Sequence, residues 1–177
     1  NELRRKATEE LIKIREGKEK TSTFLEIPNI PTKTSIKSEI SILVRTEDQI
    51  NIALRNNITN IYTPSKELYK NKGNVYLRLD RVIENHEDYK EERLLCTEFG
   101  SIIKYHQNNN IVSDYYLNVA NDFTINKFKK LNVKNITLSI ELSIDQLSKI
   151  KNKDICEVIV YGTPENMIIK NNIFNIK

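Results

Sequence analysis

The fold class is decided by the stretch from Ile111 to Gly162, IVSDYYLNVANDFTINKFKKLNVKNITLSIELSIDQLSKIKNKDICEVIVYG. Its short apolar runs are typical of strands, and the amphipathic segments between them are typical of helices, so strand and helix alternate. Because the connections are short, successive strands are expected to pair in parallel, with the helices outside the sheet.

The same alternation begins further back in the chain. Seven strands are expected, each a short apolar run: ISILV (40–44), NIYT (60–63), VYLRLD (75–80), RLLCTE (93–98), DYYLN (114–118), ITLSI (136–140) and EVIVYG (157–162). An eighth is expected over Met167–Asn172. The pattern predicts an α/β fold whose (βα) repeats form a compact or incomplete TIM-type barrel, since a typical barrel needs about 250 residues. The alternative is an open doubly wound sheet, and in either fold ligands bind at the carboxyl ends of the strands.

Residues 1–34 are predicted to be an N-terminal helix followed by an extended linker. Apolar side chains recur at helical spacing between charges before Gly17, and two prolines then prevent a helix. The barrel-like domain is expected to occupy residues 35–177. Because the chain begins with Asn1 and its only methionine is Met167, it is expected to be part of a longer polypeptide.

Several residues mark the expected ends of helices. Thr46 with Gln49, and Ser143 with Gln146, have the spacing of capping boxes, and Asp122 is predicted to cap the helix that follows it. Asn57 and Asn132 stand where a helix would end on a glycine, so a positive φ is expected at both. Residues 85–92 are predicted to form a polar helix.

Composition restricts the class of protein. The two cysteines, Cys96 and Cys156, are too few for a disulfide framework and are expected to be buried thiols of a cytoplasmic protein. No apolar run is long enough to cross a membrane, so no membrane partner is expected. The formal charge of +4 comes from interspersed acidic and basic residues, which is typical of a solvated surface and still compatible with nucleic acid.

Motifs for nucleophilic or metal chemistry are absent from the sequence. It contains no G-x-S-x-G, no H-E-x-x-H and no cysteine pair with metal-ligand spacing. The two histidines, His86 and His106, lie among polar residues and are expected to be solvated. We therefore predict no metal and no cofactor for this chain.

Polar residues near the expected carboxyl ends of strands are the candidate site. Glu141 is the candidate catalytic residue, because a carboxylate there can face a pocket and act as a base. Equally, it could cap the following helix or pair with an arginine. The candidate substrate-binding residues could orient a substrate or, for the asparagines, satisfy loop backbone groups; they are Arg45, Arg78, Asn118, Asn121, Ser139 and Tyr161.

Several segments resemble motifs of the collagenase-like peptidases, peptidase family U32. LNVAN (117–121), SIEL (139–142) and EVIVYG with Met167 are similar, in this order and at about this spacing, to the family's L-N-x-x-N, S-x-E-L and V-x-V-x-G-R-x-x-x-M segments. The opening NELRRKA resembles the N-E-x-R-R-x-A helix before the second set of (βα) units in long members. The resemblance covers nearly the whole chain and implies a C-terminal barrel-like domain of a large bacterial hydrolase, with Asn118 and Glu141 at motif positions.

The chain also departs from that family. Thr163 stands where the family has arginine, and Asn172 stands about where its first cysteine is expected. Without these groups a bidentate anion contact and an iron–sulfur ligand are lost. The resemblance therefore implies a domain that binds peptide or protein substrate, or supports an upstream domain of the same polypeptide, rather than a catalyst by itself. Two alternatives are an accessory domain of an RNA-hydroxylating enzyme of the family and a purely structural domain.

Overall fold

The computed structural model describes residues 2–16, 38–70, 74–90, 92–165 and 168. The predicted linker lies outside these residues, and so does the predicted eighth strand apart from Ile168.

Seven strands form one sheet in chain order, and each pairs in parallel with the next. They are β1 (Ser41–Leu43), β2 (Asn60–Thr63), β3 (Val75–Arg78), β4 (Arg93–Cys96), β5 (Asn110–Ser113), β6 (Ile136–Thr137) and β7 (Cys156–Glu157). The sheet curls so far that its two edge strands approach each other. This is seen in the Ser41 hydroxyl of β1, which donates to the Glu157 carboxylate of β7 at 2.7 Å. The predicted fold class, an incomplete TIM-type barrel of (βα) repeats, is confirmed.

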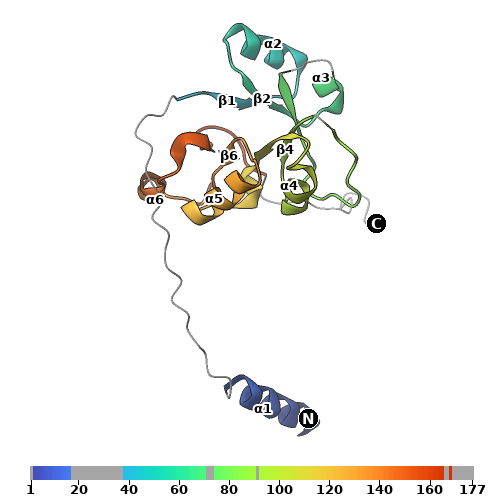
Figure 1. Cartoon of the computed structure of the whole chain (residues 1–177), viewed down its shortest axis with the longest axis vertical. Coiled ribbons are helices and arrows are strands. Elements are labelled where there is room, and N and C mark those ends of the chain that lie inside the picture. The colour runs from blue at the N-terminus through green and yellow to red at the C-terminus, as the bar shows by residue number, and fades with distance from the viewer. Residues whose placement is uncertain (1, 17–37, 71–73, 91, 166–167, 169–177) are drawn as a thin grey trace, which may run out of the picture.

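The helices that follow the strands lie on the outside of the sheet (Figure 1). They are α2 (Glu47–Arg55), α3 (Lys66–Lys70), α4 (Phe99–Tyr105), α5 (Asp122–Lys130) and α6 (Ile144–Lys149), with single 3-10 turns η1 (Tyr115–Leu117) and η2 (Lys153–Ile155). The predicted N-terminal helix is present as α1 (Glu2–Glu16), and it has no buried residue.

Most of the apolar core lies between the sheet and these helices. Side chains alternate along each strand, so Ile61 of β2 packs outward against Ile50 and Ala53 of α2. A larger outer cluster joins the middle strands to α4 and α5 through Ile102, Tyr105, Ile125 and Phe128. The inward side is smaller, with Tyr62, Leu95 and Val112 packed together with Tyr76. The outer layer therefore supplies most of the hydrophobic stabilisation.

The predicted helix ends are largely confirmed. Both capping boxes form, at Thr46 and at Ser143. Asn57 and Asn132 each have a φ of 57° in the left-handed region, which asparagine tolerates better than most residues. A local hydrogen bond or a local backbone preference sets each of these features, which is why the sequence could predict them.

The predicted cap of α5 is wrong by one residue. Asn121 is the N-cap, and its side-chain oxygen accepts the backbone N–H of Thr124 at 3.0 Å. Asp122 lies inside the helix instead, and its carboxylate accepts the backbone N–H groups of Lys151 and Asn152 at 3.0 and 2.9 Å. Asp122 thus ties α5 to the connection after α6, a contact that local spacing cannot reveal.

The predicted strand over residues 114–118 is also wrong. The strand ends at Ser113, and the Asp114 carboxylate accepts the backbone N–H of Tyr116 at 3.3 Å, which starts the 3-10 turn η1. Asn118 then takes a φ of 49° and ends the turn. The strand is formed by the apolar residues before Asp114. Asp114 itself starts a turn, as aspartate often does.

The predicted polar helix at 85–92 is absent from the described part of that segment, residues 85–90 and 92. The carbonyl of Glu87 accepts the Tyr105 hydroxyl at 2.6 Å, and that of Tyr89 accepts the Asn109 amide at 3.0 Å. These two carbonyls would accept backbone N–H groups in a helix, but here they accept side chains from α4 and from the residue Asn109 after it. Residues 85–90 therefore form an irregular segment, which we call the strap.

Candidate functional site

A buried ion pair lies at the carboxyl end of the strands, which we call the mouth of the barrel. Arg78 is the last residue of β3, and Asp114 follows β5 directly. The guanidinium Nε lies 2.8 Å from the Asp114 carboxylate, and the two side chains are only 9% and 4% exposed. The pair therefore bridges β3 and β5 across the end of β4.

The environment keeps Arg78 charged. Burial alone would lower the pKa of Arg78, but the charge and hydrogen bond of Asp114, together with Tyr116 and Glu165, more than offset it, so the pKa lies above its ordinary value. A charged guanidinium with one carboxylate on one side can bind a second anion on the other.

That second anion is supplied by the chain itself. The Glu165 carboxylate lies 3.6 Å from Arg78 and 3.8 Å from Arg45, and it accepts the Tyr116 hydroxyl at 2.7 Å. The backbone N–H of Glu165 donates to the Tyr115 hydroxyl at 3.1 Å. Glu165 therefore lies over the mouth and is held by both side-chain and main-chain contacts.

Aromatic and cationic side chains pack together beside this contact. The rings of Tyr115 and Tyr116 have centroids 4.3 Å apart. The guanidinium of Arg81 lies 4.1 Å from the centre of the Tyr116 ring, and that of Arg78 lies 5.3 Å from it. Burial raises the pKa of Tyr116, and so do hydrogen bonds with Tyr115 and Glu165, so this hydroxyl stays protonated as a donor.

Comparison with known proteins adds no identification. No family model, curated protein or solved structure matches this chain.

A second carboxylate, Glu157, lies inside the barrel near the seam between β1 and β7. Its oxygens accept four neutral donors, at distances from 2.7 to 3.2 Å: the hydroxyls of Ser41, Tyr62 and Thr137 and the amide of Asn135. Burial raises the pKa of Tyr62, and the charge of Glu157 raises it further, so Tyr62 remains a donor. These bonds join β1 and β2 to β6 and β7.

The structure brings only two of the residues predicted for the site into the cluster at the mouth, namely Arg45 and Arg78. Glu141 is exposed, and its backbone N–H donates to the hydroxyl of buried Ser139 at 3.2 Å. Asn118 and Tyr161 are exposed, and Asn121 caps α5. Asn118, Ser139 and Glu141 still share one rim, because Val119 bridges to Leu138.

Sequence reasoning missed Asp114, Tyr115, Tyr116, Glu157 and Glu165. The first three belong to the predicted strand 114–118, although in the structure they begin where β5 ends. Ending the apolar run at Ser113 would have placed them at the mouth. Glu165 shows no signal of its own in the sequence, because its contacts depend on how the chain returns over the barrel.

Among the described residues, neither histidine is hydrogen-bonded to a thiol or hydroxyl nucleophile. Burial raises the pKa of the Cys96 thiol and raises that of Cys156 to about 12. The His86 Nε2 atom lies 2.9 Å from the Glu98 carboxylate, which also accepts the hydroxyl and the backbone N–H of Ser101. The carboxylate therefore lies between the serine hydroxyl and the imidazole. Among these residues no group of three metal-ligating side chains could hold a metal ion. No helix among them is long and apolar enough to cross a membrane.

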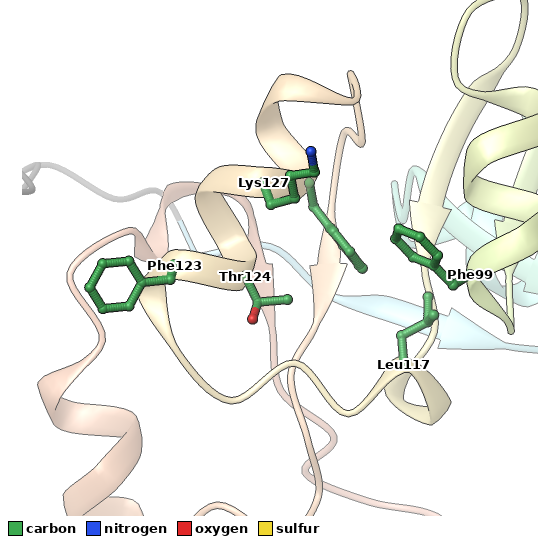
Figure 2. A pocket seen from close by; sticks show the side chains of 6 residues that line it. Phe99, Leu117, Phe123, Thr124 and Lys127 are labelled. Carbon is green, nitrogen blue, oxygen red and sulfur yellow. The ribbon is translucent and has the colours of Figure 1, made fainter. Parts of the chain in front are cut away.

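The described residues line two hollows. A groove of about 530 Å³ between α4 and α5 is lined mainly by apolar side chains; in Figure 2, Phe99 and Leu117 face α5, and Phe123 points away at the far end. A cavity of about 160 Å³ lies under the strap and reaches Arg78 and His86. The groove lacks convergent charged groups, so the mouth is the better candidate site.

Proposed function

We propose that this chain is a ligand-binding domain of a protein of the peptidase U32 type, and that the mouth of its barrel binds peptide or protein instead of catalysing a reaction by itself. The observation that carries the proposal is the convergence of Arg45 and Arg78 on one carboxylate. It occurs at the carboxyl ends of the strands, which is where barrels of this kind bind ligands.

Two further observations support the proposal. The motif-like segments LNVAN and SIEL lie side by side through the Val119–Leu138 bridge, as expected for segments that form one rim. The described residues offer binding groups at the mouth. Their thiols, in contrast, have raised pKa values. In the cluster of Ser101, Glu98 and His86, the carboxylate lies between the hydroxyl and the imidazole, so the histidine cannot take the proton of the serine. The second observation favours binding over catalysis in this domain.

Titration of the ¹⁵N-labelled chain with a tryptic digest of gelatin tests the proposal by NMR. We expect shifts in the backbone amides of residues 45, 78–81 and 114–117. Arg45→Gln should weaken binding by about tenfold, because a contact to a charged group contributes about 1.5–3 kcal/mol. Arg55→Gln is the matched control, since Arg55 is an exposed arginine at the end of α2.

Two outcomes would contradict this proposal. An absence of shifts at the mouth would exclude binding there. Cleavage of the gelatin peptides by the purified chain, lost in Glu141→Ala, would show that the domain is catalytic and that the exposed Glu141 carboxylate takes part.

The alternative is an accessory domain of an RNA-modifying enzyme of the same family. The observation in its favour is the packing of Arg81 and Arg78 on the Tyr116 ring, since arginine and tyrosine together form stacking surfaces for bases. This alternative predicts tRNA binding that weakens by orders of magnitude between about 50 and 200 mM salt. If neither RNA nor peptide binds, the remaining hypothesis is a structural domain.

A further inference from the structure

Glu165 contacts the mouth in the way that one residue of a bound peptide would. Its carboxylate faces two guanidiniums and a tyrosine hydroxyl, while its backbone N–H and C=O bond to the hydroxyls of Tyr115 and Tyr116 at 3.1 and 3.3 Å. Main-chain contacts hold an extended segment whatever its side chains are, and the guanidiniums then select a carboxylate.

The contact is also one that a better ligand could displace. The Glu165 carboxylate is 3.6 and 3.8 Å from the two guanidiniums, which is longer than the roughly 2.7–2.9 Å of a charge-assisted hydrogen bond. Its side chain is 42% exposed, and that of Arg45 is 64% exposed. Because Arg78 is 9% exposed and fixed by Asp114, its guanidinium is preorganised, whereas its ion pair with Glu165 is long and partly solvated.

We propose that the mouth of the barrel is a receptor for an extended acidic peptide segment, whose glutamate or aspartate carboxylate replaces that of Glu165 between Arg45 and Arg78. In the absence of this ligand the chain's own Glu165 occupies the receptor and competes with it. The inference rests on the proposed function, because it names the ligand class of the same site.

The main-chain contacts favour a peptide over a phosphate-bearing ligand. The Tyr115 hydroxyl accepts an N–H, a donor that a phosphodiester does not carry. Asp114 lies directly behind Arg78 and already accepts from its guanidinium, so a singly charged carboxylate meets less repulsion there than a doubly charged phosphate. These contacts match a carboxylate beside a peptide backbone.

The test compares two capped tripeptides. Acetyl-Thr-Pro-Glu-amide has the sequence of residues 163–165, and in acetyl-Thr-Pro-Gln-amide glutamine replaces the glutamate. Their dissociation constants are measured by NMR titration of the whole chain, its Glu165→Ala variant and its Glu67→Ala variant. Glu67 is an exposed glutamate on α3 and serves as the matched control. The isosteric Glu165→Gln provides a second variant with an unchanged backbone.

We expect both Glu165 variants to bind the glutamate peptide more tightly than the unaltered chain, by about tenfold if the segment occupies the mouth nine times in ten. Glu67→Ala should leave the dissociation constant unchanged. The glutamine peptide should bind at least about tenfold more weakly than the glutamate peptide, because it lacks the charge that the guanidiniums select.

Other outcomes would overturn the inference in distinguishable ways. If the Glu165 variants and the unaltered chain bind gelatin peptides equally well at the mouth, the internal occupant does not compete, and the inference fails while the proposed function stands. Equal affinity for the two tripeptides would remove the carboxylate as the recognised group. If Glu165→Ala prefers a decauridylate RNA to the glutamate peptide, the acidic-peptide assignment fails. If no variant binds any peptide at the mouth, both proposals fail.

Discussion

Glu157 and Glu165 are two carboxylates of the same barrel that are held in opposite ways. Glu157 is half-buried among four neutral donors, whereas Glu165 is 42% exposed and faces two guanidiniums and a hydroxyl. The neutral donors come from both edges of the sheet, so their bonds fix the shape of the barrel. The charged contact at the mouth is solvated and exchangeable, so it contributes little to folding and can instead serve recognition.

The largest effect is expected at Arg78, the buried cation of the mouth. Arg78→Met should lower the free energy of unfolding by about 3–5 kcal/mol, because it leaves the 4% exposed Asp114 carboxylate without its cation. Urea unfolding followed by circular dichroism measures the change. The double variant Arg78→Met with Asp114→Leu should recover at least half of the loss, and failure to recover would mean that packing, rather than charge, explains the effect.

Removal of the interior carboxylate should have the next largest effect. Glu157→Ala should lower the free energy of unfolding by about 2–3 kcal/mol, because the buried Tyr62 hydroxyl and its neighbours lose their acceptor. Glu157→Gln keeps an acceptor oxygen and should cost less. If Glu157→Ala were as stable as the unaltered chain, the network would not hold the seam between β1 and β7.

Acid should release Glu165 from the mouth. The Tyr116 hydrogen bond, together with Arg78 and Arg45, lowers the pKa of Glu165 below its ordinary 4.5. Since docking lowers this pKa, docking is fully favoured above 4.5 and is lost as the pH falls through the lowered value. The chemical shift of the Glu165 amide reports this release, and a midpoint above 4.5 would contradict the docking contact.

The smallest effect on stability is expected for Glu165 itself. Glu165→Gln should change the free energy of unfolding by less than about 0.5 kcal/mol, since exposed ion pairs contribute little. The same urea unfolding experiment measures it beside Glu157→Gln. A loss as large as that of Glu157→Ala would show that the Thr163-Pro164-Glu165 segment is a structural part of the barrel.

The sequence predicted the fold better than the site because the two depend on contacts of different range. Thr46 and Ser143 form capping boxes with residues three positions away, and the alternation of apolar residues reports which side of a strand is buried. The predicted strand at 114–118 failed because its two tyrosines resemble strand residues, although Asp114 closes a turn at that point. This error moved the expected site from Asp114 to Asn118.

The sequence by itself determined that parallel strands alternate with outer helices and that Asn57 and Asn132 make left-handed turns, because near neighbours in the chain set those features. Only the tertiary structure decided that Glu157 bonds to Ser41 across the barrel and that Glu165 lies between Arg45 and Arg78. Those partners are more than 80 residues apart in the sequence, and curling of the whole sheet brings them together. A pattern read along the chain carries no information about such pairs, since their distance depends on the summed geometry of every strand between them.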